Sequence, residues 1–292
     1  MKPPAFDYAA PTSVGEAVGL LEQHGGEAKV LAGGQSLMPL LNMRLARPGL
    51  LVDLGRVAGL DYVRESGSDL VVGAMTPQRS VERSPLVARL NPLLHAAVRF
   101  IAHPQIRNRG TIGGSLAHAD PAAECPAIAL ALDAELRAVG PGGERTIAAA
   151  DFFVTYLTTV LEPTEVLTEV RFPGLPARAG WSFQEVARRH GDFALAGAVT
   201  ILALDGGGRC ASARVVLFGV GATPLRARAV EEVVVGVQPA SAVFEQAAAR
   251  AAREIDEPLT DVHGSGAYRR HLAEVLTRRG LTEAAERART AR

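Results

Sequence analysis

The chain has 292 residues, with 31 basic and 31 acidic side chains, so its formal net charge at neutral pH is zero. This balance argues against a general affinity for nucleic acid or for an anionic membrane surface, and an aromatic content of only 5% disfavours a platform for stacked bases. No uncharged apolar run reaches the roughly 20 residues that a membrane span requires. We therefore expect no membrane span.

Cysteine usage points to a reducing compartment. The two cysteines, Cys125 and Cys210, show no Cys-x-x-Cys spacing, so neither a zinc site nor an iron–sulfur site is expected within this chain. A chain of this length does not depend on disulfides, and its N-terminus has no apolar stretch typical of a signal peptide. We therefore expect a cytoplasmic protein, and the length favours two domains.

The N-terminal region predicts a small unit of alternating helices and strands. Residues 12–25 carry an apolar stripe at helical spacing and end at a glycine pair. Residues 28–32 form a short apolar strand that leads directly into Gly33-Gly34. A second helix is expected over 36–45 and a second strand over 50–54.

Hairpins and helices alternate in the next part of the chain, up to residue 175. Two hairpins have glycine-containing turns, and helical segments lie between them. The expected elements are a hairpin over 61–74, helices over 81–90, 92–102 and 121–132, a hairpin over 134–147 and a strand over 165–172.

The composition changes after the segment Pro173-Gly174-Leu175-Pro176, which is the best candidate for a linker. Beyond it we expect antiparallel strands over 181–187, 196–204 and 211–220, followed by helices over 224–235, 240–254 and 265–279. The predicted fold class is α+β. The predicted domains are residues 1–175, with subdomains of about 1–56 and 57–175, and residues 176–292.

Two glycine pairs about 80 positions apart are the most informative feature of the chain. One lies in Leu31-Ala32-Gly33-Gly34-Gln35-Ser36-Leu37 and the other in Gly110-Thr111-Ile112-Gly113-Gly114-Ser115. Glycine allows a tight turn and a close approach of a ligand to the main chain, and successive N–H groups that point one way form an anion pocket. A single pair is more often an ordinary turn, but two similar pairs beside apolar segments suggest a pyrophosphate held by backbone.

Several familiar alternatives do not fit these segments. Neither glycine pair matches the Rossmann or P-loop pattern, and Ser36 lacks the context of a nucleophile elbow. His118, Asp120 and Glu124 follow the second pair, and they suggest either a metal or general-base site or simply a polar loop with a capping Asp120. We favour the polar loop for His118, whereas Glu124 is placed to accept a hydrogen bond from a sugar hydroxyl.

The two glycine segments, with the continuation to Leu41 in the first and to Pro121 in the second, resemble the FAD-binding medium subunit of molybdenum hydroxylases. That family includes the flavoproteins of aerobic carbon monoxide dehydrogenase and bacterial xanthine dehydrogenase. The resemblance extends over nearly the whole chain and includes the segments 188–196 and 264–270. It implies a two-part FAD-binding domain of the vanillyl-alcohol-oxidase (PCMH) type and a smaller C-terminal domain that closes over the flavin.

The resemblance also implies which residues bind FAD, and it implies no catalytic residue and no metal ligand in this chain. Glu124 stands where the family often has Asp, and Gln184 where relatives often have Lys, which leaves open how the pyrimidine edge of the flavin is polarised. Leu167 would pack against the flavin ring, and Phe193 would cover it. The implied set is Leu31, Ala32, Gly33, Gly34, Gln35, Ser36, Leu37, Ile101, Ala102, Gly110, Thr111, Ile112, Gly113, Gly114, Ser115, Ala117, Glu124, Leu167, Gln184 and Phe193.

As a member of this family, the chain would transfer electrons and would not activate the organic substrate itself. Non-covalent FAD would take electrons from the [2Fe–2S] clusters of a small subunit, while a large molybdopterin subunit hydroxylates the substrate, in a dimer of heterotrimers. Two alternatives remain open. One is a stand-alone FAD-dependent oxidase or reductase on the same fold, and the other is a binding module in which the glycine pairs are only turns.

Overall fold

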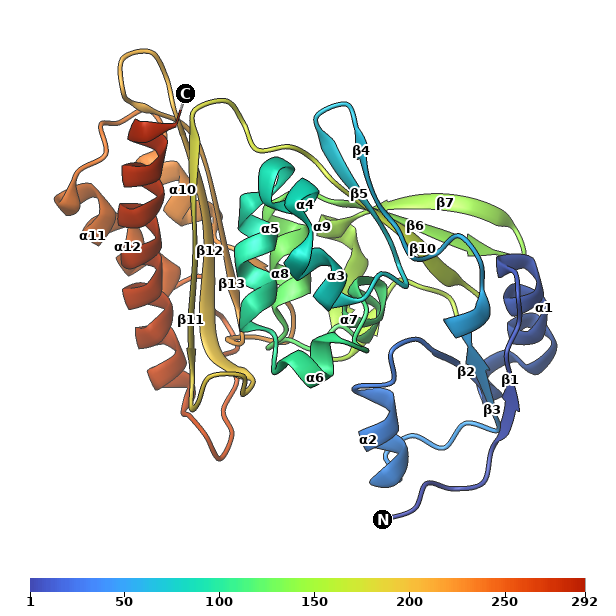
Figure 1. Cartoon of the computed structure of the whole chain (residues 1–292). Helices are drawn as coiled ribbons and strands as arrows, with labels where there is room; N and C mark the ends of the chain where they lie inside the picture. The colour runs from blue at the N-terminus through green and yellow to red at the C-terminus, as the bar shows by residue number, and fades with distance from the viewer. Residues whose placement is uncertain (292) are drawn as a thin grey trace.

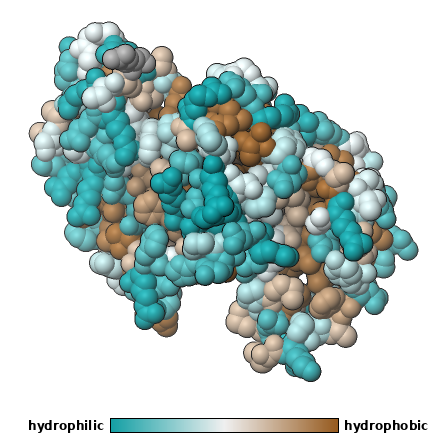
Figure 2. Space-filling view, viewed as in Figure 1, coloured by the Kyte–Doolittle hydropathy of each residue, from teal (hydrophilic) through white to brown (hydrophobic). Residues whose placement is uncertain are grey.

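The computed structural model describes residues 1–291 and divides the chain into three sheets with their covering helices, plus a small hairpin (Figure 1). The N-terminal unit lies at the right of the view, the five-stranded sheet and a group of short helices lie in the middle, and the C-terminal sheet and helices lie at the left. Figure 2 shows that the α12 side is mainly hydrophilic, whereas apolar side chains are visible at the lower right, around α2.

The N-terminal unit is a three-stranded parallel sheet in the order β1-β3-β2. The predicted strands are β2 (Ala28–Leu31) and β3 (Leu50–Asp53), and the predicted helices are α1 (Val14–His24) and the shorter α2 (Leu37–Asn42). Strand β1 (Asp7–Ala9) was not predicted, because three largely exposed residues leave no alternating pattern. Ser13 caps α1 by accepting the N–H of Glu16 at 3.2 Å.

The central unit is a five-stranded antiparallel sheet in the order β4-β5-β10-β6-β7. Both predicted hairpins and the predicted strand are present. The strands are β4 (Val63–Ser66), β5 (Asp69–Gly73), β6 (Glu135–Gly140), β7 (Gly143–Ala148) and β10 (Val166–Phe172). A further small hairpin, β8 (Phe153–Thr155) and β9 (Thr158–Thr159), lies outside this sheet and was not predicted.

Short helices cover the central sheet. Prolines and capping side chains break the predicted helices into pieces, because Ser84 caps one helix and Asn91 caps the next. The predicted ranges overlap α3 (Gln78–Arg83), α4 (Pro85–Leu90), α5 (Pro92–Ala97) and α8 (Glu124–Ala131). Three further short helices were not predicted: α6 (Pro104–Arg107), α7 (Ile112–His118) and α9 (Ala149–Phe152). Helix α7 corrects the prediction of a glycine loop, because Gly113 and Gly114 lie in its first turn.

The C-terminal part has the three predicted long antiparallel strands and one short addition. The strands are β11 (Ala179–Ala187), β12 (Ala194–Leu204), β13 (Cys210–Phe218) and the two-residue β14 (Leu225–Arg226), in this order across the sheet. The helices are α10 (Arg228–Val234), α11 (Ser241–Ala251) and α12 (Gly266–Thr290). Helix α12 is longer than predicted, since it continues past Gly280.

The central strand of this sheet, β12, is buried along its entire length. Its residues Ala198 and Leu202 pack toward α11 and α12, whereas Val199 and Ile201 join the core of the central helices. The C-terminal sheet is therefore covered on one face by its own helices and on the other face by α5 and α8. Within residues 1–291, no helix is long and apolar enough to span a bilayer.

Candidate functional site

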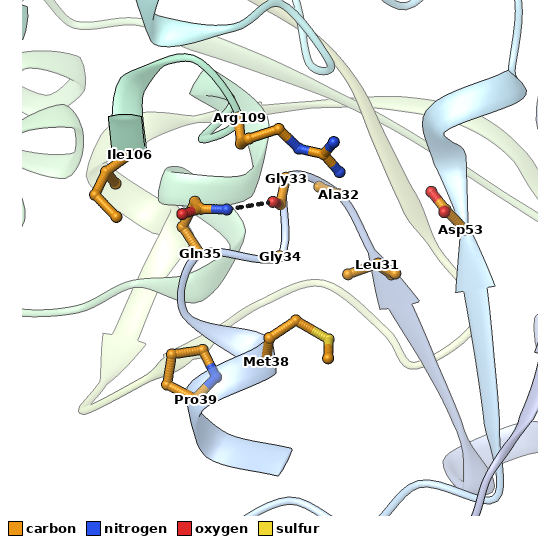
Figure 3. Close-up of a pocket in the computed structure, with 10 residues that line it drawn as sticks. All are labelled: Leu31, Ala32, Gly33, Gly34, Gln35, Met38, Pro39, Asp53, Ile106 and Arg109. Carbon is orange, nitrogen blue, oxygen red and sulfur yellow. Dashed lines mark hydrogen bonds between the residues drawn. The ribbon is translucent and has the colours of Figure 1, made fainter. Parts of the chain in front are cut away.

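The first glycine segment lines a cavity of about 390 Å³ at the end of β2 (Figure 3). Cavities of a few hundred Å³ are typical of small-molecule sites. Strand β2 and the loop after it, the start of α2, the end of β3 and the region of α6 contribute the walls. The lining residues are Leu31, Ala32, Gly33, Gly34, Gln35, Met38, Pro39, Asp53, Ile106 and Arg109.

The two glycine segments lie directly against each other. A Cβ on Gly33 would lie 2.0 Å from the carbonyl oxygen of Arg109, and a Cβ on Gly114 would lie 3.3 Å from the Cβ of Ala32. Backbone contacts this close require glycine at position 33. Segments almost 80 residues apart in the sequence thus form one wall, which is what a shared site for one ligand needs.

The main-chain N–H groups of the two segments differ in their availability. Within residues 1–291, the N–H groups of Gly33, Gly34 and Gln35 donate to no other residue. The side-chain amide of Gln35 donates to the carbonyl oxygen of Gly33 at 2.9 Å, and this hydrogen bond fixes the loop (Figure 3). The first segment therefore offers unpaired backbone donors of the kind that bind anions.

In the second segment, most of these donors are already used within the chain. The N–H of Gly113 donates to Ala74 at 2.8 Å, that of Ile112 donates to Thr76 at 3.1 Å, and that of Gly114 donates to the hydroxyl of Thr111 at 3.0 Å. The second segment therefore offers fewer free backbone donors than the first. The second segment supplies the start of α7, which Thr111 caps, and a close-packed glycine surface.

Arg109 is a functional candidate that the sequence reasoning missed. Its exposed side chain extends beside the Gly33 loop in the direction of Asp53 (Figure 3). In the described part of the chain this guanidinium makes neither a hydrogen bond nor a salt bridge, whereas Asp53 accepts from the hydroxyl of Tyr8 at 2.7 Å. A cation therefore lies at the same cavity as the free backbone donors, and the binding of a pyrophosphate by backbone stays a prediction. The place of Arg109 directly before Gly110 was the available signal.

Glu124 begins α8 and is deeply buried, with 8% of its surface exposed. Burial raises the pKa of its carboxyl to about 7, and the charge of Asp120 adds to this rise. Asp120 does not cap α8, because its carboxylate accepts the N–H of Ala122 within the preceding turn. The neighbouring Cys125 thiol faces the hydroxyl of Ser115, although burial raises the pKa of the thiol to about 12. Helix α8, which Glu124 begins, packs against α7, the helix that contains Gly113 and Gly114.

A loop of the C-terminal part closes against the predicted site at Ala102. Gly191 has a positive φ of 87°, and a Cβ there would lie 2.4 Å from the ring of His103 and 2.9 Å from the carbonyl oxygen of Ala102. Arg107 holds the other side of this turn by donating to the carbonyl oxygens of Ile101 at 2.7 Å and Ala102 at 3.2 Å. The two predicted residues Ile101 and Ala102 therefore occupy a fixed turn beneath the C-terminal loop.

Phe193, in the same loop, is 72% exposed. An aromatic side chain left this open is consistent with the predicted contact to a ring, which stays a prediction. Leu167 is buried in the central core beside an irregularity in β10. Of the remaining predicted residues, Ser36 and Leu37 begin α2, and Ala117 is exposed on α7.

The side chain of Gln184 lies on the face of β11 that contacts α12, away from the predicted site. Its amide donates to the carboxylate of Glu283 at 2.7 Å and to the hydroxyl of Ser182 at 3.0 Å. The opposite face of β11 presents Phe183, which belongs to the central core, and Glu185, which interacts with Glu124. Gln184 and Glu185 thus point to opposite faces of β11, and the flavin contact expected of Gln184 stays a prediction.

Fold and site together define a flavoprotein subunit, and the comparisons agree. The FAD binding domain in molybdopterin dehydrogenase matches residues 4–175, and the CO dehydrogenase flavoprotein C-terminal domain matches residues 181–284. The chain belongs to this family of FAD-binding medium subunits of molybdenum hydroxylases. It is an oxidoreductase subunit, and FAD is the cofactor of its family.

Individual relatives cover almost the full chain. The 6-hydroxypseudooxynicotine dehydrogenase complex subunit alpha of Paenarthrobacter nicotinovorans is 44% identical over 99% of this chain and 97% of its own length. The carbon monoxide dehydrogenase medium chain of Hydrogenophaga pseudoflava is 41% identical over 97% of this chain and 98% of its own length. A solved structure of carbon monoxide dehydrogenase from Hydrogenophaga pseudoflava, which lacks the Mo-pyranopterin moiety, superposes with a TM-score of 0.95 at 42% identity, covering 98% of this chain and 99% of that chain.

Proposed function

We propose that this chain binds one non-covalent FAD and transfers electrons within a molybdopterin-dependent hydroxylase or dehydrogenase. The observation that carries the proposal is the contact between the two glycine segments, which places unpaired N–H groups and Arg109 around one cavity. FAD, when bound, supplies the ability to accept electrons and to pass them on. The protein contributes binding, orientation and control of the local charge.

The residues present fit an anionic dinucleotide. The N–H groups of Gly33, Gly34 and Gln35 are free to donate to phosphate oxygens, and the Arg109 guanidinium lies at the same cavity. Glu124, at the start of α8, is a carboxyl group suited to a sugar hydroxyl. The turn at Ala102 and the exposed Phe193 would exclude water on the side of the C-terminal loop.

The assembly is the second part of the proposal. Relatives carry names such as dehydrogenase complex subunit and medium chain, which are names of components of larger enzymes. We propose that this chain takes electrons from [2Fe–2S] clusters of a small subunit, that a large subunit holds the molybdopterin, and that the three form a dimer of heterotrimers. The two free, buried cysteines are consistent with the proposed cytoplasmic location.

Two measurements test this function. The purified chain, alone and co-expressed with neighbouring subunits, should show a two-band flavin absorption spectrum with about one FAD per chain. In the assembled enzyme, rapid mixing with substrate should reduce this flavin during turnover, and an external acceptor should reoxidise it.

Other outcomes would replace the proposal. A flavin that stays oxidised while the assembled enzyme turns over would refute the electron-transfer role. Rapid reduction of the isolated chain by a small donor would support a stand-alone FAD oxidase or reductase. A chain that binds no flavin with or without partners would support a binding module.

A further inference from the structure

A buried arginine lies two positions before Arg109 and joins two other parts of the chain. Arg107, the last residue of α6, is 6% exposed. Its guanidinium donates to both carboxylate oxygens of Glu82 in α3, at 3.0 and 3.3 Å. It also donates to the carbonyl oxygen of Ile101 at 2.7 Å and to that of Ala102 at 3.2 Å. The forked guanidinium can serve one carboxylate and two carbonyl groups at once, which the single ammonium of a lysine cannot match.

The turn that Arg107 holds has a strained backbone. Ala102 has a φ of 40°, a value that residues with a side chain seldom adopt. Gly191 packs against the same turn from the C-terminal part, where a Cβ would lie 2.9 Å from the carbonyl oxygen of Ala102. A conformation of this kind persists only where the surrounding structure fixes it. Arg107 supplies fixed hydrogen bonds from the buried side of the turn.

The same segment continues directly into the wall of the cavity. Ile106 and Arg109 line the cavity, on either side of Arg107 in the sequence (Figure 3). The N–H groups of Arg109 and Gly110 both donate to the carbonyl oxygen of Ile106, at 3.1 and 2.7 Å. The carbonyl oxygen of Arg109 is also the atom that a Cβ on Gly33 would meet. The place of the Arg109 side chain therefore depends on a segment that Arg107 fixes.

The ion pair of Arg107 with Glu82 is nearly closed to solvent, with 7% and 13% of the two side chains exposed. A buried pair of this kind is weak evidence for stability, because the loss of hydration offsets the attraction. Its clearer contribution here is a defined geometry for the guanidinium. Arg79 binds the same carboxylate at 2.7 Å but, within residues 1–291, makes no hydrogen bond to the turn.

We propose that Arg107 is a positioning residue of the cofactor site: anchored by Glu82, it holds residues 101–110 so that the Arg109 guanidinium faces the cavity. The inference rests on the proposed FAD function and deepens it, because it names what fixes the cationic part of the wall. Arg107 is not among the residues that line the cavity, so it would act through Arg109.

The test is a double-mutant cycle on the dissociation constant of FAD, measured by flavin fluorescence with the full chain. Arg107→Met should weaken binding by about tenfold to a hundredfold, as much as the loss of a charge-assisted bond from Arg109. In that background, Arg109→Gln should cost less than about threefold more, whereas the losses of independent residues would multiply to within about twofold. The salt dependence that Arg109 gives to FAD binding should likewise disappear in Arg107→Met.

Three variants serve as controls. Arg79→Met, the matched control, removes the other guanidinium on Glu82 and should bind FAD like the wild type. Gly180→Ala crowds α12 against β11 on the opposite side of the molecule, so it should lower stability without changing the effect of Arg109→Gln (Figure 1). Arg107→Lys keeps a charge beside Glu82 but cannot also serve both carbonyl groups, so its affinity should lie between those of the wild type and Arg107→Met.

Glu82→Gln provides a milder version of the same test. It removes only the anionic anchor of Arg107, so it carries the cycle if Arg107→Met does not fold. It should weaken FAD binding and should show the same lack of additivity with Arg109→Gln.

A further readout needs no cofactor. Hydrogen exchange followed by mass spectrometry should show faster exchange over residues 101–110 in Arg107→Met, or in Glu82→Gln, than in the wild type. Arg79→Met should keep the wild-type exchange in this segment. Unchanged exchange in the Arg107 and Glu82 variants would contradict the inference whatever the FAD measurements show.

The FAD measurements separate the inference from the proposed function. Wild-type affinity in Arg107→Met, or losses that multiply with those of Arg109→Gln, would overturn the positioning role while leaving the FAD function intact. A chain that binds no FAD in any form would refute the proposed function and, with it, the role of Arg107 in cofactor binding.

Discussion

The two glycine segments touch at Gly33 because glycine has no side chain. A Cβ there would lie 2.0 Å from the carbonyl oxygen of Arg109 and 2.9 Å from the Cα of Gly110, and both are main-chain atoms that cannot rotate away. Gly33→Ala should therefore push the segments apart and strongly reduce the FAD content of the purified chain, measured by flavin absorbance per protein.

The control for this change is Gly19→Ala on α1, where the added methyl group meets open space. This variant should keep its FAD and gain about 0.5–1 kcal/mol in unfolding free energy, because alanine is the better helix former. If Gly33→Ala retained full FAD occupancy, the contact between the glycine segments would not be part of the cofactor site.

Arg109 gives a second test of the same cavity. A charge-assisted hydrogen bond to a phosphate contributes about 1.5–3 kcal/mol, so Arg109→Gln should weaken FAD binding by about tenfold to a hundredfold. The unfolding free energy should change little, since the side chain is exposed and pairs with nothing in the described chain. Arg99→Gln, also exposed, is the control. The loss should shrink at high salt, and equal affinities for both variants would show that Arg109 does not face the pyrophosphate.

Residue by residue, the sequence identified the glycine pairs but not the chemistry between them. It predicted that Gly33 and Gly113-Gly114 serve one site, and the contacts bring these segments together. It did not show that the N–H of Gly113 is used by Ala74, because that bond depends on how α7 packs against β5. The bond of Gln184 to Glu283 likewise depends on how α12 packs against β11, so no local pattern predicts it, and the flavin contact expected of Gln184 stays a prediction.

Among the elements, α12 packs very closely against the C-terminal sheet. A Cβ on Gly180 of β11 would lie 1.9 Å from the carbonyl oxygen of Ala284, and a Cβ on Gly280 would lie 2.6 Å from the hydroxyl of Thr200. Glycines on both surfaces let the helix lie directly on the strands, where Glu283 accepts from the hydroxyl of Ser182 at 2.6 Å. The predicted helix over 265–279 is too short, because glycine often ends a helix. Here the helix continues past Gly280, which allows α12 to pack closely against Thr200 of β12.

Gly180→Ala should therefore separate α12 from β11 and lower the unfolding free energy by about 1–3 kcal/mol, the usual cost of inserting atoms into a packed interior. Urea unfolding followed by circular dichroism measures this change. Gly206→Ala, in the turn after β12, meets no atom within 4 Å and should change the unfolding free energy by less than about 0.5 kcal/mol. Equal stabilities for the two variants would mean that α12 can shift outward without cost.

On the scale of the whole molecule, one core joins parts that the sequence divides. The Pro-Gly segment 173–176 predicts a boundary between residues 1–175 and 176–292, and this division stays a prediction. Phe183 and Phe218 of the C-terminal sheet nevertheless belong to the same apolar cluster as Ile128 of α8. The rings of Phe100 and Phe183 lie 4.9 Å apart, and those of Phe183 and Phe218 lie 5.5 Å apart. Contacts of this kind depend on tertiary structure, so no local sequence pattern predicts them.

The shared core predicts that the chain unfolds as one unit, although chains of this size often unfold domain by domain. Neither part can lose its structure without exposing the apolar face of the other, and exposed apolar surface costs about 25 cal/mol per Å². Calorimetry of the full chain should show a single transition whose calorimetric and van't Hoff enthalpies agree, and Phe183→Ala should lower its temperature without splitting it. Two separate transitions in the unmodified chain would instead mean that the parts before and after the linker unfold independently. The packing between them would then contribute little to the unfolding free energy.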